Sequence, residues 1–291
     1  MEHFKNPFGP PDFATERVIE NGRFLDDALT RARTHRYFSH PFLSSFPATT
    51  PTPETVTFVL SSTYQLVAPF TAFLCALGGQ TPDLRSRFAL LDNIYEEMGC
   101  GDFEAAHPRL YLKMLASIGV SEEAAATMPA LSAIRRINDQ LREVVESRPF
   151  SVACAMLALA EAVIPPTFPV FVTLAQSAFP HVDMTFFDRH GTRDEEHSDD
   201  AATLFALSAE SAHFPIVEAE MRRALDHRSE LLDDWMAVAT NGVVRARSAV
   251  IARPRPLSER PPRSRPLSER PPRSRPLSTP PSRRPSVPPS R

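Results

Sequence analysis

The octapeptide HGTRDEEH, residues 190–197, has a histidine at each end and charged residues between them. His190, Asp194 and His197 are spaced by four and three positions, so they share one face of a helix. Two imidazoles and one carboxylate are a ligand set that suits redox iron with open coordination positions. The alternative is the exposed face of a charged helix, and these eight residues alone support both interpretations equally.

The residues that flank the octapeptide continue the same face with apolar side chains. Phe186 and Phe187 lie one turn before it, and Ala201, Leu204 and Phe205 lie one turn after it. A buried face with three ionisable groups is costly unless these groups are paired or bind a metal ion. The flanks therefore favour a metal site.

A second cluster lies in the segment NIYEEMGCGDFEAAHPRL. Glu97, Glu104 and His107 fall on one helical face if a helix continues through the glycines between them. Glu104 and His107 also form a Glu-x-x-His pair, the spacing that di-iron carboxylate bundles use. Between Glu96 and Glu97, the inward residue is expected to be Glu97, because apolar Ile94 lies one turn before it.

Glu161 stands in the apolar segment MLALAEAVIPP and is the only charged residue between Arg148 and His181. It therefore needs a partner inside the fold. A metal ion would supply one. The alternatives are a hydrogen bond to a tyrosine, a tryptophan or the backbone, or a position at the helix end before Pro165. We favour the metal ion.

The three segments together supply three carboxylates and three imidazoles as candidate metal ligands and catalytic residues. They are Glu97, His107, Glu161, His190, Asp194 and His197. This set is enough for two irons with one bridging carboxylate, whereas a lone zinc site would not need so many acids.

Long segments with a period of 3.6 residues, few glycines and no clear alternating strands predict an all-α body. Thr52 and Thr81, each followed by a proline, are expected helix N-caps. His40 and His181 lie beside prolines and are interpreted as structural or surface residues. The expected helices span approximately 12–36, 54–77, 82–98, 103–118, 129–147, 150–163, 167–178, 183–210 and 212–245.

Residues 151–175 are apolar enough to suggest a membrane span. Glu161 opposes this, because a carboxylate costs about 3 kcal/mol in a bilayer, and two prolines break the helix. We expect a buried core helix and no membrane span. The three unpaired cysteines are typical of a reducing compartment, and the N-terminus shows no secretion signal, so a cytoplasmic location is expected.

Charge divides the chain near residue 250. Residues 251–291 hold 11 arginines and two acids, a net charge of +9. Subtracting these from 32 basic and 35 acidic residues leaves 21 and 33 in residues 1–250, a net charge of −12, which excludes nucleic-acid binding by the body. The Arg/Pro/Ser-rich tail repeats RPLSERPPRS and is expected to be disordered. It is either a docking arm or, as we favour, an extension without a role in the activity.

These motifs resemble the haem-oxygenase-like di-metal oxidases, the iron-containing redox enzyme family. The resemblance rests on Glu97 in YEEMGCG, His107 in AAHPRL, Glu161 in ALAEAVIPP and the octapeptide HGTRDEEH, and it covers about residues 35–210. It implies a haem-oxygenase-like bundle of about seven helices over residues 1–250, without haem, and two Fe(II) ions that react with O2. Because dimers are common in this fold, it also suggests a homodimer.

Members of this family N-oxygenate an arginine-derived substrate, fragment an amino acid or decarboxylate a fatty acid. The separation of Glu97 and His107 resembles the N-oxygenase arrangement, whereas Glu104 with His107 would match the decarboxylase, so the bridging glutamate is left open. The N-oxygenase type adds a glutamate on an earlier helix, and here residues 54–77 contain no acid after Glu54. The substrate is left open as well.

We expect an O2-dependent di-iron oxidoreductase that acts on a small amino-acid-like or amine substrate, by N-oxygenation or oxidative C–C cleavage in specialised metabolism. The alternatives are an oxidative decarboxylase or desaturase of a fatty-acid-like substrate and, in another class, a non-catalytic helical bundle with a partner-binding basic tail. The substrate is expected to lie against apolar side chains one turn from the ligands, namely Ile94, Leu157, Phe186 and Phe187.

Overall fold

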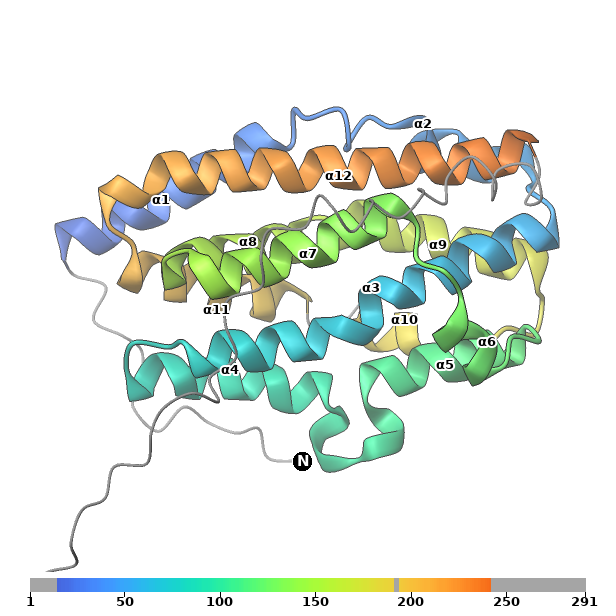
Figure 1. The fold of residues 1–291 in the computed structure, drawn as a ribbon, viewed down its shortest axis with the longest axis horizontal. Helices are drawn as coiled ribbons and strands as arrows, with labels where there is room; N and C mark the ends of the chain where they lie inside the picture. Colours follow the sequence, from blue (N-terminus) through green and yellow to red (C-terminus); the bar gives the residue numbers. More distant parts are fainter. Residues whose placement is uncertain (1–14, 191–193, 242–291) are drawn as a thin grey trace, which may run out of the picture. The chain divides into compact units, whose positions relative to one another are not determined.

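The structure is a computed structural model that describes residues 15–190 and 194–241, without the side chains of residues 190–198 and 241. All regular elements in these ranges are helical, and none is a strand (Figure 1). The predicted all-α fold is confirmed. The tail that was predicted over residues 251–291 lies outside the described residues.

The longer helices are α1 (Glu16–Ala32), α3 (Pro53–Gly79), α4 (Leu84–Glu97), α5 (His107–Ser117), α7 (Ser132–Ser147), α8 (Phe150–Ala162), α9 (Ile164–Ala178), α11 (Asp194–Ser208) and α12 (Phe214–Asn241). Shorter helical elements connect them: α2 (Pro41–Ser44), η1 (Phe46–Thr49), η2 (Gly99–Gly101), η3 (Phe103–Ala105), α6 (Glu122–Thr127), α10 (Thr185–His190) and η4 (Ser211–His213). The single helix expected over 183–210 corresponds to α10 and α11.

Helix α8 forms the centre of the core. Every residue from Ser151 to Leu159 is buried, and α11, α12, α7 and α9 pack around the helix. By length and composition alone, α3 and the continuous stretch of α8 and α9 could each cross a membrane. The side chains of α8 are covered by protein, however, as in the core helix that the sequence predicts. The prolines at 165 and 166 fall in the first turn of α9, where a helix tolerates them.

The two expected N-caps have different outcomes. Thr52 caps α3 as predicted, with Pro53 at the first helical position. Helix α4 begins instead after Asp83, whose carboxylate accepts a hydrogen bond from the backbone N–H of Ser86 at 2.9 Å. Thr81 is not a cap, and its hydroxyl donates to the carbonyl of Gly78 at 3.0 Å. A carboxylate is the better cap of the two because it also interacts favourably with the positive end of the helix dipole.

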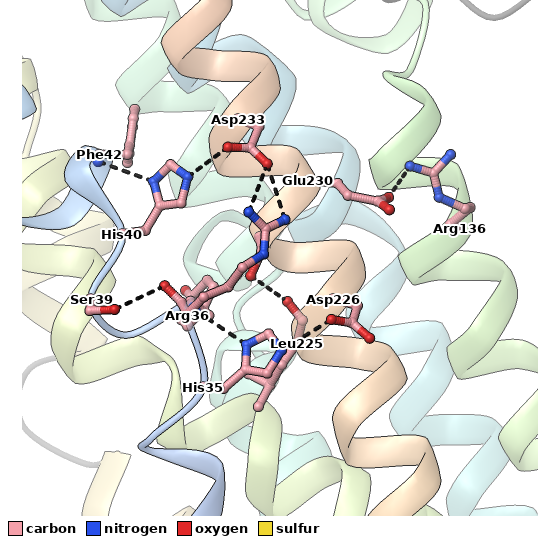
Figure 2. A network of polar contacts seen from close by, with 12 residues as sticks. His35, Arg36, Ser39, His40, Phe42, Arg136, Leu225, Asp226, Glu230 and Asp233 are labelled. Atoms are coloured by element: carbon pink, nitrogen blue, oxygen red, sulfur yellow. Dashed lines mark hydrogen bonds and ion pairs between the residues drawn. The ribbon is translucent and has the colours of Figure 1, made fainter.

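Two histidines attach the segment after α1 to α12 (Figure 2). His40 Nδ1 accepts a hydrogen bond from the backbone N–H of Phe42 at 3.1 Å, and its Nε2 lies 2.9 Å from Asp233 Oδ1. His35 repeats the arrangement, with a backbone N–H at 3.2 Å and Asp226 Oδ1 at 3.1 Å. Because Nδ1 accepts, Nε2 carries the hydrogen in both rings and donates it to an aspartate. His40 therefore has the structural role that its sequence context predicts.

Candidate metal centre

Glu97 ends α4 on the buried face of that helix. The buried residues of α4 are Ser86, Leu90, Asn93 and Glu97, which follow one another at helical spacing and form a single stripe. Glu97 is only 5% exposed, whereas Glu96 is half-buried. The inward-facing residue of the two is therefore Glu97.

The continuous helix that would join Glu97 to His107 does not form. Gly99, Cys100 and Gly101 all have left-handed backbone conformations, with φ of 79°, 55° and 89°. A Cβ at Gly99 would lie 2.5 Å from the backbone nitrogen of Ala106, so only glycine fits this close approach. The turn ends α4 and sends the chain through η2 and η3 to α5, which begins at His107.

Glu97 and His107 meet in spite of this break. His107 Nδ1 lies 2.8 Å from Glu97 Oε2, and the two side chains are 11% and 7% exposed. They approach at ion-pair distance without the alignment of an N–H···O hydrogen bond. A buried carboxylate needs a compensating charge or ligand, and carboxylate and imidazole are both ligands of non-haem iron. The donor chemistry of this pair fits an iron ion.

Glu104 does not share this interior position. It is exposed and forms ion pairs with Arg109 at 3.4 Å and Lys113 at 3.5 Å. Of the two candidates for the glutamate that accompanies His107, the buried one is Glu97. We therefore propose Glu97 as the iron ligand and assign Glu104 to the surface.

Glu161 is only 4% exposed on the central helix α8. Its carboxylate is close enough to the guanidinium of Arg228, on α12, for the two charges to attract each other. A carboxylate at this depth needs compensation. Its proposed role as an iron ligand is compatible with this position.

The side chains of His190, Asp194 and His197 lie outside the described part of the structure. Their backbones belong to the end of α10 and the start of α11. Helix α11 packs against α8 and α4, and α10 packs against α5. These three neighbours carry the other candidate ligands, so the topology brings the helices of all six together. Among the side chains that are described, no group of three potential metal ligands is found.

The proposed apolar residues divide into two groups. Phe186, Phe187 and Leu157 are buried, each at most 5% exposed. The ring of Phe186 stands edge-on to the His107 ring, with centroids 6.2 Å apart. Ile94 instead packs towards Gly78 on α3. Phe186 is thus the apolar residue that directly borders the Glu97–His107 pair.

Asn93 is a polar residue at this site that the sequence reasoning missed. It is 3% exposed, lies one turn before Glu97, and its Oδ1 has no hydrogen-bond partner among the described residues. A buried acceptor without a donor costs about 1–3 kcal/mol. The available signal was the spacing of Asn93 and Glu97, which places both on one helical face.

Comparisons with known proteins identify the family and the fold of this chain. The chain matches the iron-containing redox enzyme family over residues 57–231. It is also 26% identical to the 4-chloro-allylglycine synthase of Streptantibioticus cattleyicolor over 121 residues, which are 42% of this chain and 46% of that enzyme. The match therefore spans less than half of the length of that relative.

Three solved structures share the fold. A CADD-like protein of unknown function from Nostoc punctiforme superimposes with a TM-score of 0.63 at 15% identity, over 76% of this chain and 99% of that one. A domain with a haem-oxygenase-like fold from Shewanella denitrificans gives 0.56 at 19% identity, over 75% and 91%. A TenA homologue from Pseudomonas syringae gives 0.54 at 14% identity, over 81% and 97%. The predicted fold and family are confirmed, and the chain belongs to the iron-containing redox enzyme family, with a haem-oxygenase-like fold.

Proposed function

We propose that this iron-containing redox enzyme is an O2-dependent di-iron oxidoreductase of specialised metabolism that oxidises a small amino-acid-like substrate. The observation that carries the proposal is the buried pair of Glu97 and His107, 2.8 Å apart, in a member of this family. No haem is involved in the proposed chemistry.

Six residues would hold the two irons: Glu97, His107, Glu161, His190, Asp194 and His197. Iron bound there would supply the redox chemistry with O2. The carboxylates would offset the positive charge of the irons, and neutral imidazoles would donate without adding charge. Phe186 excludes water beside His107. The Oδ1 of Asn93, which has no hydrogen-bond partner among the described residues, offers an acceptor for an N–H or O–H group of the substrate.

Two observations support the proposed substrate class: the name of one relative and the exposed position of Glu104. The name 4-chloro-allylglycine synthase describes an enzyme whose product is an amino acid. The fatty-acid alternative drew its support from the Glu-x-x-His pair, and the exposure of Glu104 removes that support. We therefore favour an amino-acid-like substrate, with N-oxygenation and C–C cleavage as the two candidate reactions.

Anaerobic titration with Fe(II), followed by rapid mixing with O2, tests the proposal. We expect uptake of about two irons per chain and a transient visible absorption band that requires O2. Glu161→Ala and His190→Ala should lose both signals. Glu146→Ala, an exposed position on α7, is the control that should retain them. Equal iron uptake by all three variants would contradict the proposed site.

A further inference from the structure

Arg228 occupies an unusual place on α12. Most of the buried residues of this helix are apolar. These apolar residues are each at most 5% exposed: Met221, Ala224, Leu225, Leu231, Leu232, Trp235 and Val238. Arg228 falls in the middle of this stripe, at helical spacing from the residues on either side. An arginine in such a stripe needs a partner for its charge.

The guanidinium of Arg228 is enclosed but retains hydrogen-bonding capacity. Burial lowers its pKa, although part of the side chain remains accessible to solvent. Among the described residues it makes neither a hydrogen bond nor an ion pair within 4 Å. Arg223, five residues earlier on the same helix, is in contrast bound to Glu143 at 2.8 Å and to Glu220 at 3.2 Å. No described residue therefore occupies the N–H donors of Arg228, which can bind a ligand.

Arg228 is also not needed to attach α12 to its neighbours. The histidine–aspartate bonds fix the side of α12 that carries Asp226 and Asp233 (Figure 2). Arg148 binds Glu220 at 2.9 Å and ties α12 to the residue after α7. A structural explanation would require a hydrogen bond or an ion pair within 4 Å from Arg228 to another element, and the described part of the chain provides neither.

Among the described residues, Tyr37 and Glu161 interact electrostatically with Arg228. The Thr167 hydroxyl donates to the carbonyl of Val163 at 2.6 Å, so the Tyr37 hydroxyl, 2.6 Å from Thr167 Oγ1, must donate to Thr167. Tyr37 therefore presents only lone pairs to its other neighbours and cannot donate to an anion. The donor for an anion at this position is Arg228.

We propose that Arg228 binds the carboxylate group of the substrate, next to the proposed iron ligand Glu161. This inference rests on the proposed function, in which Glu161 is committed to iron and the substrate resembles an amino acid. With Glu161 so engaged, the guanidinium needs a second negative charge, and a substrate carboxylate supplies it. The planar guanidinium matches a carboxylate through two parallel N–H···O bonds.

Three small molecules serve as probes that separate the contributions of an amine and a carboxylate to binding. L-Allylglycine carries an amine and a carboxylate, pent-4-enoate carries only the carboxylate, and but-3-en-1-amine carries only the amine. Their binding to the full-length protein is measured by calorimetry, under nitrogen, with and without Fe(II). Measurement without Fe(II) excludes direct coordination of a carboxylate to iron. If the protein binds L-allylglycine more tightly than pent-4-enoate, the substrate that supplies the carboxylate is an amino acid. Equal affinity for the two indicates a plain carboxylic acid. Both results agree with the proposal that Arg228 binds a carboxylate.

The variants are Arg228→Gln, Arg228→Lys and, as a control, Arg222→Gln, which changes an exposed arginine of the same helix. Arg228→Gln should weaken the two carboxylate probes by about tenfold or more, the size of a lost charge-assisted hydrogen bond. It should leave but-3-en-1-amine unchanged. Arg228→Lys retains the charge and should lose less, and it replaces Arg228→Gln as the test variant if thermal melting shows that the glutamine variant does not fold.

Equal affinities in Arg228→Gln and Arg222→Gln, or the absence of carboxylate-dependent binding to the wild-type protein, would overturn the inference. Failure of the wild-type protein to bind iron would instead overturn the proposed function. The two failures are distinguishable, because carboxylate binding is also measured on the iron-free protein.

Discussion

His107 Nδ1 lies 2.8 Å from Glu97 Oε2, although α4 ends at Glu97 and α5 begins at His107. The pairing depends on the left-handed turn between the two helices. The same turn leaves Glu104 on the surface, beside Arg109 and Lys113. Two glutamates that are close in sequence to one histidine thus occupy opposite environments.

Substitution of these two glutamates should have opposite effects on iron binding. Glu97→Gln removes the buried carboxylate beside His107 and should lower iron affinity by at least about 10-fold to 100-fold, the range for loss of a residue that only supports a metal ligand. Glu104→Gln should leave iron affinity unchanged and alter the free energy of unfolding by no more than about 1 kcal/mol, because it removes surface ion pairs. Fe(II) titration and urea unfolding of both variants test this. Loss of iron binding in Glu104→Gln would contradict the assignment.

Gly99→Ala should damage both the fold and the site. The left-handed backbone at Gly99 costs alanine about 1–2 kcal/mol, and the new Cβ would also meet the backbone of Ala105 and Ala106 within 2.6 Å. We expect the free energy of unfolding to fall by more than about 2 kcal/mol, with weaker iron binding. Gly79→Ala is the matched control, because its Cβ meets nothing within 4 Å. An equal effect of the two substitutions on urea unfolding would exclude a special role for Gly99.

Periodicity predicted the elements of this fold well because most helices bury one face. The stripe of α4 and the all-apolar α8 are visible in the sequence as repeating patterns. The same patterns singled out Glu97 and Glu161 as acids in buried positions. The position of helix ends was harder to predict, since Thr81 and Asp83 are both residues that cap helices and α4 begins after Asp83.

Contacts between distant elements could not be predicted in this way. The approach of Glu97 to His107 depends on three consecutive left-handed residues, and helical spacing assumed a continuous helix there. Arg228 lies far along the chain from Glu161, and the packing of α12 against α8 brings their charges together. Its position in an apolar stripe was nevertheless a signal available in the sequence.

Asn93→Leu should separate stability from activity. Leucine branches at Cγ as asparagine does, and it removes the buried Oδ1, which has no hydrogen-bond partner among the described residues, so the melting temperature should stay the same or rise. If Asn93 positions the substrate, O2 consumption by the iron-loaded protein with its substrate should fall about fivefold, the equivalent of one hydrogen bond. Asn138→Leu is the control, because the Asn138 amide donates to Gln65 at 2.9 Å and its loss should lower the melting temperature. A destabilised Asn93→Leu protein would indicate a structural role instead.

Asp234 should make the stability of the protein dependent on pH. Burial on α12 raises the pKa of this carboxyl to about 6, and the attraction of Arg136 only partly offsets the effect. The folded state therefore binds the proton more tightly than the unfolded state, whose aspartate has a pKa of about 4. Ionisation of Asp234 therefore lowers the free energy of unfolding. This loss is absent below a pH of about 4, grows as the pH rises, and reaches its full size above the pKa of the folded state.

Asp234→Asn removes this penalty, so it should stabilise the protein at pH 7.5 and have a smaller effect at pH 4.5. Urea unfolding at both pH values measures the difference between the variant and the wild-type protein. Asp27→Asn, an exposed position on α1, controls for the loss of one negative charge. A stabilisation by Asp234→Asn that is equal at the two pH values would show that the gain arises from packing, because only the removal of a titrating carboxylate makes it depend on pH.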